Sequence, residues 1–432
     1  MRGGFMEEAF FSAFMEELQE SLRNLDPPRP MSSWSSQLYL SKWRRAAGSI
    51  KPEGAVVACD GSISESIFSG GLTVWTARAV AHVYSEGGEV RSIPRVAVKI
   101  GYRLKGRPYF MKALELETLH RAVEEAEKEF HRVFALYDGS LYLRFIHHVP
   151  RLEAIKEIFQ RYVGALINCL EIAQGEGVSM VGLSKDSDVS YLRARILLDS
   201  ILMERQEIGE ELRIERRSVK RMAERIEEIV KRSPEDPILR AYLEEFKLEV
   251  SDEALYTSLA LEPGFTIPLL LAPQTQFITE EVRRGTRSWW ESSFRKELWS
   301  RLEALASLLD EYYSQPPIAI SYWKAASGQG VYRVDVPSHI LGFKGRCGDL
   351  QEDEFLSIGE STRAEELIAN LNWLTREPYA VSPLTEVDAI VRLDRSLYRQ
   401  VYEPVIVEEL KRRGFEVAPR KRWIRDLVLR GY

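Results

Sequence analysis

Two Asp-Gly-Ser steps, each placed at the end of an apolar run, constrain this chain more than any other feature. The first begins at Asp60 after residues 55–59, and the second begins at Asp138 after residues 133–137. A helical pattern carrying Glu115 lies between them. Asp-Gly is also a common hairpin turn, so simple turn chemistry stays open. The alternative is a set of carboxylates at buried strand ends and on an intervening helix, which could hold divalent metal for phosphodiester cleavage.

The bulk composition predicts a cytoplasmic globular protein. The chain has 432 residues, is 45% hydrophobic, and carries a formal net charge of −6. This length suits one large or two to three ordinary domains, and the negative charge restricts any nucleic-acid site to a local basic surface. Cys59, Cys169 and Cys347 are too widely spaced for a zinc motif or a disulfide framework. We expect no membrane partner, because no apolar run approaches about 18 residues and the N-terminus lacks a signal-peptide pattern.

The order of the predicted elements is that of an RNase H-like domain. The elements are strands at 55–60, 72–84 and 90–102, a helix at roughly 109–131, strands at 133–137 and 141–147, a helix from 150 to about 174, and a strand at 178–183. Later segments predict a strand hairpin over 318–323 and 331–336 and helices at 362–375, 384–393 and 397–414. The sequence therefore predicts an α/β fold with an RNase H-like mixed sheet flanked by helices.

The same patterns divide the chain into four parts. We expect an N-terminal helix and connector over 1–50, an RNase H-like core over 51–189 and 256–395, a helical insertion over 190–255, and a C-terminal helix and basic tail over 396–432. The insertion could pack on its own core or project as a subunit-contact or DNA-guiding arm. Its basic residues alternate with glutamates, which favours a solvated face over a nucleic-acid groove.

Helical phase separates two acidic residues of the helix at 109–131. Glu115 falls on the apolar stripe, near its N-terminal end, whereas Glu117 falls on the opposite, charged face. A carboxylate that faces a core must shift its pKa or find a cation. Asp60 and Asp138 would repel Glu115 unless Mg²⁺ or Mn²⁺ lay between them, and oxygen-only ligands suit these hard cations.

Six segments occur in a fixed order between residues 55 and 395. They are Val56–Ser62, Ala113–Glu117, Leu136–Leu141, Val181–Ser187, Val331–Pro337 and the region around Tyr379 and Pro383-Leu384. This ordered set resembles the NurA nucleases of archaea and some bacteria, which work with the HerA DNA translocase. The resemblance implies an RNase H-like fold, a homodimer around a central channel, and cleavage of single-stranded DNA with 5′-to-3′ degradation of DNA ends. It also implies a role in double-strand-break end resection for homologous recombination, with a hexameric HerA-type ATPase as partner.

The resemblance extends to individual site residues. It implies that Asp60, Glu115 and Asp138 are catalytic residues that hold Mn²⁺ or Mg²⁺, with two ions expected. Lys185 corresponds to a residue that contacts DNA phosphate, although a solvated lysine in a turn would give the same pattern.

The C-terminal part of the site departs from the family pattern. The family has Gly-Tyr-Pro, then Pro-Leu, then Ala-His, and Asp388 stands here where the histidine is expected. Asp is a competent oxygen ligand, so we assign Asp388 as a fourth ligand within a working site. Tyr379 is assigned to the family's tyrosine position, with the register displaced by about one residue.

Two other functions stay open. The Asp388 departure is also consistent with a catalytically weakened subunit that clamps DNA or docks the translocase. An RNase H-like enzyme that cleaves RNA or hybrids is the other alternative, although no small-RNA-binding module is apparent in the chain.

Overall fold

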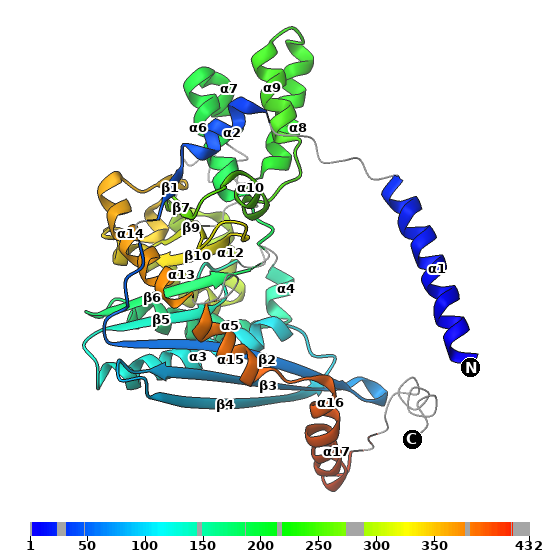
Figure 1. Cartoon of the computed structure of the whole chain (residues 1–432). Helices are drawn as coiled ribbons and strands as arrows, with labels where there is room; N and C mark the ends of the chain where they lie inside the picture. Colours follow the sequence, from blue (N-terminus) through cyan, green and yellow to red (C-terminus); the bar gives the residue numbers. More distant parts are fainter. Residues whose placement is uncertain are drawn as a thin grey trace.

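A single mixed sheet runs through the molecule, with helices on both faces (Figure 1). The computed structural model describes residues 2–23, 32–46, 48–144, 149–185, 187–213, 218–273, 289–375, 381–415 and 417. The strands are β1 (Trp43–Arg45), β2 (Ala55–Ile67), β3 (Leu72–Tyr84), β4 (Val90–Tyr102), β5 (Val133–Asp138), β6 (Val178–Ser184), β7 (Gly264–Thr266), β8 (Leu269–Leu270), β9 (Ile318–Lys324), β10 (Tyr332–Pro337) and β11 (Glu354–Phe355).

The described helices surround this sheet. They are α1 (Arg2–Arg23), α2 (Ser33–Leu40), α3 (Arg107–Glu127), α4 (Val149–Glu153), α5 (Lys156–Ile172), α6 (Tyr191–Glu204), α7 (Gln206–Leu212), α8 (Val219–Arg232), α9 (Pro237–Phe246), α10 (Asp252–Leu259), α12 (Ser293–Arg301), α13 (Glu303–Ser314), α14 (Ile358–Leu374), α15 (Ser382–Val391), α16 (Arg395–Leu397) and α17 (Glu403–Arg412). None of the helices in these described ranges is long and apolar enough to cross a lipid bilayer.

The strand order is β1-β7-β9-β10-β6-β5-β2-β3-β4. Strands β2, β3 and β4 form an antiparallel meander, and β5 and β6 run parallel to β2. This half of the sheet has the RNase H-like topology that the sequence predicts. Strand β10 continues the sheet antiparallel to β6, so residues from the predicted second core segment extend the same sheet.

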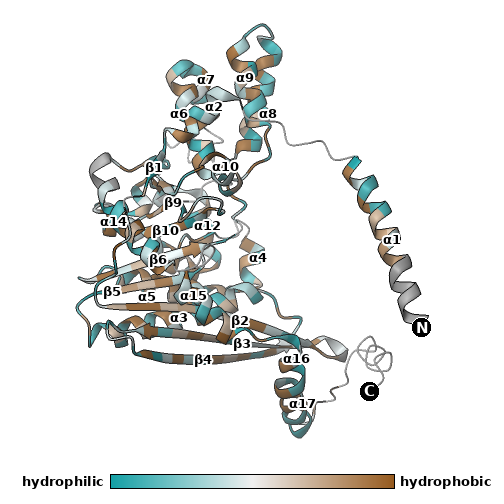
Figure 2. Ribbon diagram, viewed as in Figure 1, coloured by the Kyte–Doolittle hydropathy of each residue, from teal (hydrophilic) through white to brown (hydrophobic). Residues whose placement is uncertain are grey.

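Apolar side chains of the central strands fill two cores, one on each face of the sheet. One core contains Leu116 and Leu119 of α3 and Phe159 of α5, and the other contains Ile368 of α14 and Val387 of α15. Strands β5 and β9 are buried on both faces, which explains their nearly continuous apolar sequence. Figure 2 shows the same concentration of hydrophobic residues in the central strands.

Most predicted elements are confirmed, but the end of the first strand is wrong and one predicted strand is not found where the chain is described. Strand β2 does not stop at Asp60, because it pairs with β3 as far as Ile67. The first Asp-Gly-Ser step is therefore in the middle of a strand and is no turn. The strand predicted at 141–147 is absent over 141–144, and 145–148 lie outside the described residues. Residues 141–144 instead fold over the sheet through bonds to β10.

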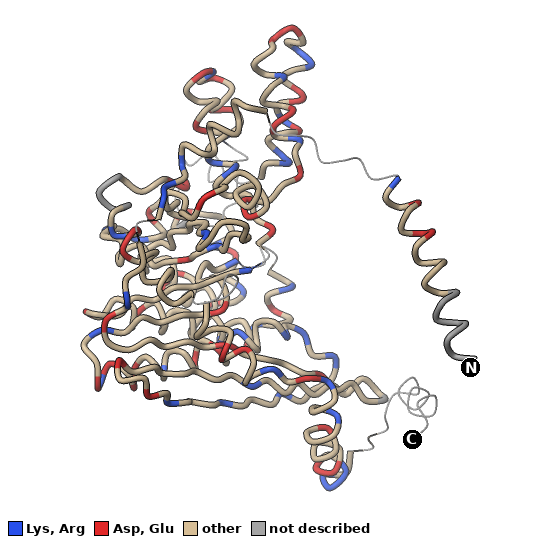
Figure 3. The backbone as a smooth tube through the Cα atoms, in the orientation of Figure 1, with Lys and Arg blue, Asp and Glu red and all other residues tan. Residues whose placement is uncertain are grey.

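Helices α6 to α9 occupy the predicted insertion at one end of the molecule (Figure 1). Lys and Arg are mixed with Glu along α8 (Figure 3), as expected for a solvated face. The domain limits themselves stay a prediction.

A buried carboxylate of β10 forms an ion pair within its own strand and hydrogen bonds to the loop that follows β5. Asp335 is fully buried and accepts a bond of 2.8 Å from Nε of Arg333, which is 3% exposed. The same carboxylate accepts bonds from the hydroxyl of Ser140 at 2.6 Å and from the backbone N–H groups of Leu141 and Tyr142. One carboxylate therefore neutralises a buried guanidinium and fixes the loop beside Asp138.

We expect Asp335→Asn to lower the free energy of unfolding by about 3–5 kcal/mol, because it leaves the Arg333 charge buried without its counter-ion. The matched control is Asp349→Asn, which removes an exposed pair with Arg346 and is expected to leave the stability almost unchanged. Urea unfolding followed by circular dichroism measures both. Equal stabilities for the two variants would contradict this role of Asp335.

Candidate active site

The first Asp-Gly-Ser step is positioned by the end of a parallel ladder. The pairing of β2 with β5 ends at Cys59↔Tyr137, and β2 continues beyond it beside β3 alone. Asp60 is the first residue past this ladder. Val56 and Ala58 of β2 pack in the core beneath α15, and Asp60 lies on the same face of the sheet because side chains alternate along a strand. Asp138 is the last residue of β5 and lies on the same face. The register therefore places the two aspartates at adjacent positions.

Glu115 approaches the two aspartates from the opposite face, on helix α3. Gly61 makes the approach possible, since a Cβ on this residue would lie 2.5 Å from Glu115 Oε1 and 2.6 Å from its Cγ. Glu115 is 2% exposed and accepts a bond of 3.2 Å from the hydroxyl of Tyr137. The predicted helical phase is confirmed, because Glu117 instead forms a bidentate pair with Arg161 at 2.6 and 2.8 Å.

These carboxylates affect one another's protonation. Burial, followed by the charge of Asp138, raises the pKa of Asp60 to about 6. Burial, followed by the charge of Asp60, raises the pKa of Glu115 to about 8. Within the described residues, neither group forms an ion pair with Lys or Arg. The charged forms of both groups are therefore disfavoured, and a cation bound beside them would favour their deprotonation.

Lys185 lies just beyond the end of β6 and is bonded to Asp138, with 2.8 Å between Nζ and Oδ2. Burial acts to lower the pKa of Lys185, but the bond to Asp138 outweighs it and the pKa is raised. Lys185 is therefore a fixed positive charge at the edge of the carboxylate group.

Asp388 reaches the site from α15, more than 300 residues after β2. Its charge is among those that raise the pKa of Asp60. The side chain is 42% exposed and lies 3.3 Å from Arg392. Tyr379 lies outside the described residues, so its assignment stays a prediction.

Several side chains that the sequence analysis missed hold α15 in place. The hydroxyl of Tyr84 donates to Glu386 at 2.8 Å. Arg78 donates to the backbone carbonyls of residues 390–392 at the C-terminal end of the helix, where a positive charge is favourable. The backbone N–H of Leu393 donates to the hydroxyl of Ser62 at 3.0 Å.

The two Asp-Gly-Ser steps thus have the same arrangement of side chains. In each, the Asp faces the site, and the Ser bonds a later part of the chain: Ser62 bonds Leu393, and Ser140 bonds Asp335. Gly139, the glycine of the second step, also permits close packing, because a Cβ there would lie 2.7 Å from the Tyr137 ring. The repeated serine was the signal in the sequence for these contacts.

The side chains at the site fit a hard divalent cation in donor type and charge. Asp60, Glu115, Asp138 and Asp388 offer only oxygen ligands, which Mg²⁺ and Mn²⁺ prefer. The space beside Gly61 is occupied by the Glu115 side chain. No three His, Cys, Asp or Glu side chains of the described part of the chain are close enough to form a complete metal site. The ligand roles therefore stay a prediction.

Comparison with known proteins assigns the family. A sequence model of the NurA domain matches residues 54–342, more than half of the chain. The chain belongs to the NurA family. This supports a nuclease and confirms the resemblance drawn from the sequence segments. No curated protein matches the sequence significantly.

Solved nuclease structures are also similar to this chain. The NurA nuclease from Sulfolobus solfataricus is 13% identical, with 97% of this chain and 100% of that chain covered and a TM-score of 0.47. Endonuclease V from Bacillus subtilis is 14% identical over 36% of this chain and 54% of that chain, with a TM-score of 0.16. The type 1 enzyme LC9-RNase H1 is 11% identical over 33% and 68%, with a TM-score of 0.17.

We expect Glu115→Gln to lower DNA cleavage by about 100-fold, the scale seen when the surroundings of a metal site are altered. Glu117→Gln is the matched control from the same helix, and it should leave activity within about twofold because it removes only a partly exposed ion pair. Initial rates on single-stranded DNA measure both. Equal losses would mean that Glu115 has no special place in the site.

Gly61→Ala should lower cleavage by about 100-fold, because the added Cβ would displace the Glu115 carboxylate and a 1 Å misplacement can have that effect. Gly61 has no positive φ, so alanine introduces no backbone strain. Gly164→Ala is the control, since a Cβ there meets nothing within 4 Å. Normal activity of Gly61→Ala with an unchanged fold would show that the close approach is dispensable.

Proposed function

We propose that this NurA-family protein is a Mn²⁺- or Mg²⁺-dependent deoxyribonuclease. It would cleave single-stranded DNA internally and degrade DNA ends from 5′ to 3′, in cytoplasmic end resection for homologous recombination. The family resemblance supports a homodimer and a hexameric HerA-type ATPase as partners. The observation that carries the proposal is the convergence of Asp60, Asp138 and Glu115, with the pKa values of Asp60 and Glu115 raised by burial and by neighbouring carboxylates.

The roles of the residues follow from their placement. Asp60, Asp138, Glu115 and Asp388 would hold one or two divalent ions, which supply Lewis-acid stabilisation of phosphate charge when bound. The two aspartates fix the geometry, because their register is set by a backbone ladder. Glu115 is shielded from water, so its carboxylate interacts strongly with any nearby charge.

Lys185 would orient the substrate. Its amine is bonded to Asp138, and a cation at the carboxylates would compete for that oxygen and leave the amine available to a DNA phosphate. No nucleophilic side chain is required, because water is the attacking group in phosphodiester hydrolysis.

One observation favours the alternative of a catalytically weakened subunit that clamps DNA or docks the translocase. Asp388 stands where the family has histidine, and its carboxylate is paired with Arg392 and partly exposed. In that case the protein would bind single-stranded DNA without cleaving it.

The test is cleavage of single-stranded DNA by the purified protein in Mn²⁺, with chelator added as a control. We expect cleavage by the unaltered protein and none by Asp60→Asn, because the neutral amide lacks the negative charge with which the carboxylate would hold a divalent cation. Asp188→Asn alters an exposed carboxylate and should retain activity. Binding without cleavage by the unaltered protein would favour the clamping function, and full activity of Asp60→Asn at saturating Mn²⁺ would refute the ligand assignment.

A further inference from the structure

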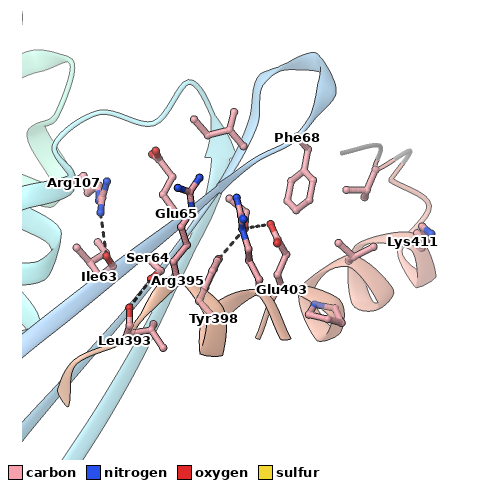
Figure 4. A pocket seen from close by; sticks show the side chains of 16 residues that line it. Ile63, Ser64, Glu65, Phe68, Arg107, Leu393, Arg395, Tyr398, Glu403 and Lys411 are labelled. Atoms are coloured by element: carbon pink, nitrogen blue, oxygen red, sulfur yellow. Dashed lines mark hydrogen bonds between the residues drawn. The ribbon is translucent and has the colours of Figure 1, made fainter. Parts of the chain in front are cut away.

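A cavity of about 680 Å³ lies between the second half of β2 and the C-terminal segment (Figure 4). Residues 63–67 of β2 and the adjoining Phe68 form one wall, and lining residues between Leu393 and Lys411 form the other. Ser64 and Ser66 of the cavity lining lie on the same face of β2 as Asp60, because side chains alternate along a strand. Ser66 bonds the hydroxyl of Tyr398 at 3.0 Å, which holds the C-terminal segment against the strand.

The lining of this cavity is basic. Four basic and two acidic side chains line it: Arg107, Arg395, Arg399, Lys411, Glu65 and Glu403. Both acidic groups accept bonds from neutral donors, Glu65 from the Trp75 indole at 2.8 Å and Glu403 from the Ser66 hydroxyl at 2.6 Å. They are therefore held by the wall of the cavity and form no ion pair with its arginines.

Within the described residues none of the four basic groups has a counter-ion, and Arg107 donates to the backbone carbonyl of Ile63 at 3.0 Å. Across the described ranges, Arg395, Arg399 and Lys411 form no ion pair, whereas Arg412 and Arg413 on the same C-terminal segment pair with Glu408 and Glu409. Unpaired cations that converge on one cavity in a chain of net charge −6 indicate an anionic ligand. The apolar parts of Phe68, Val407 and Pro404 complete the lining.

The position of the cavity relates it to the carboxylates. Residues 64–68 follow Asp60 by four to eight positions, or about 13–26 Å at roughly 3.3 Å per strand residue. A stacked nucleic-acid strand rises about 3.4 Å per nucleotide, so the cavity lies about four to eight nucleotides from the carboxylates. A strand whose cleaved phosphate is at Asp60 can therefore extend into it.

We propose that this cavity binds single-stranded nucleic acid at a distance from the cleaved phosphate, with Arg395, Arg399 and Lys411 contacting backbone phosphates. This inference rests on the proposed nuclease function and adds a second contact region to it. Phosphate contacts carry no sequence information, so the cavity would hold the strand without selecting bases.

Binding of fluorescein-labelled thymidine oligonucleotides tests the proposal. The measurement is anisotropy across a salt series in the Asp60→Asn background, so that cleavage does not interfere. We expect Arg395→Ala/Arg399→Ala to bind a dodecamer about tenfold more weakly, with a log–log salt slope shallower by about 1.4, or about 0.7 per lost phosphate contact. A trimer is too short to contact the carboxylates and the cavity at once, so its affinity should fall less than that of the dodecamer.

Arg412→Ala/Arg413→Ala is the matched control, and Lys411→Ala is an independent variant in case the double variant fails to fold. We expect the control to bind normally and Lys411→Ala to weaken the dodecamer selectively. Unchanged dodecamer binding, or equal losses for trimer and dodecamer, would overturn the cavity assignment. Failure of the unaltered protein to cleave any DNA would instead refute the proposed function, so the two failures are distinguishable.

Discussion

Asp60, Glu115 and Asp138 lie near one another at β2, which is electrostatically unfavourable for three carboxylates. The packing of the surrounding strands and helix holds them in these positions. A backbone ladder fixes Asp60 beside Asp138, and neither aspartate can separate without breaking the pairing of β2 with β5. Glu115 is fixed independently by the packing of α3 against the sheet, with Gly61 providing the space. Burial, and after it the charge of the neighbouring carboxylate, raises the pKa values of Asp60 and Glu115. A site of this kind is preorganised for positive charge.

Serine residues of both Asp-Gly-Ser steps connect this charged centre to the rest of the fold. Ser62 holds the segment after α15, and Ser140 shares the buried Asp335 with Arg333. The second connection is the stronger one, since a buried charge without its partner is costly. The site is consequently supported from two distant parts of the chain, one on each face of the sheet.

Local patterns predicted the parts of the site that depend on local geometry. The phase of a single helix separated Glu115 from Glu117, and two apolar runs located Asp60 and Asp138. What failed was the end of β2, because the Asp-Gly pair looks the same in a turn and in a strand where glycine makes room for another side chain. Tertiary packing, which the local sequence does not contain, decides between them.

The contacts around α15 could not be found in the same way. Tyr84 and Glu386 are separated by 302 positions, and no periodicity links them. Arg78 donates to backbone carbonyls, which every residue has, so the sequence does not indicate which residues accept these bonds. Ser62, Ser64 and Ser66 follow Asp60 at every second position and therefore lie on the same face of β2. Polar residues on one face of a buried strand need hydrogen-bond partners, so this pattern was a usable signal that another part of the chain packs there. The basic cavity could not be predicted from the sequence either. Its arginines and lysine come from separate segments, and only the fold brings them together.

The anchoring of α15 has a consequence for the newly synthesised chain. Translation proceeds from the N-terminus, and domains generally fold as they emerge. Strands β2 to β6 can pair early, whereas the bond between Ser62 and Leu393 spans 331 positions and forms only when most of the chain has left the ribosome. Asp388 therefore joins the other carboxylates last, so the complete carboxylate set forms only after α15 has been synthesised.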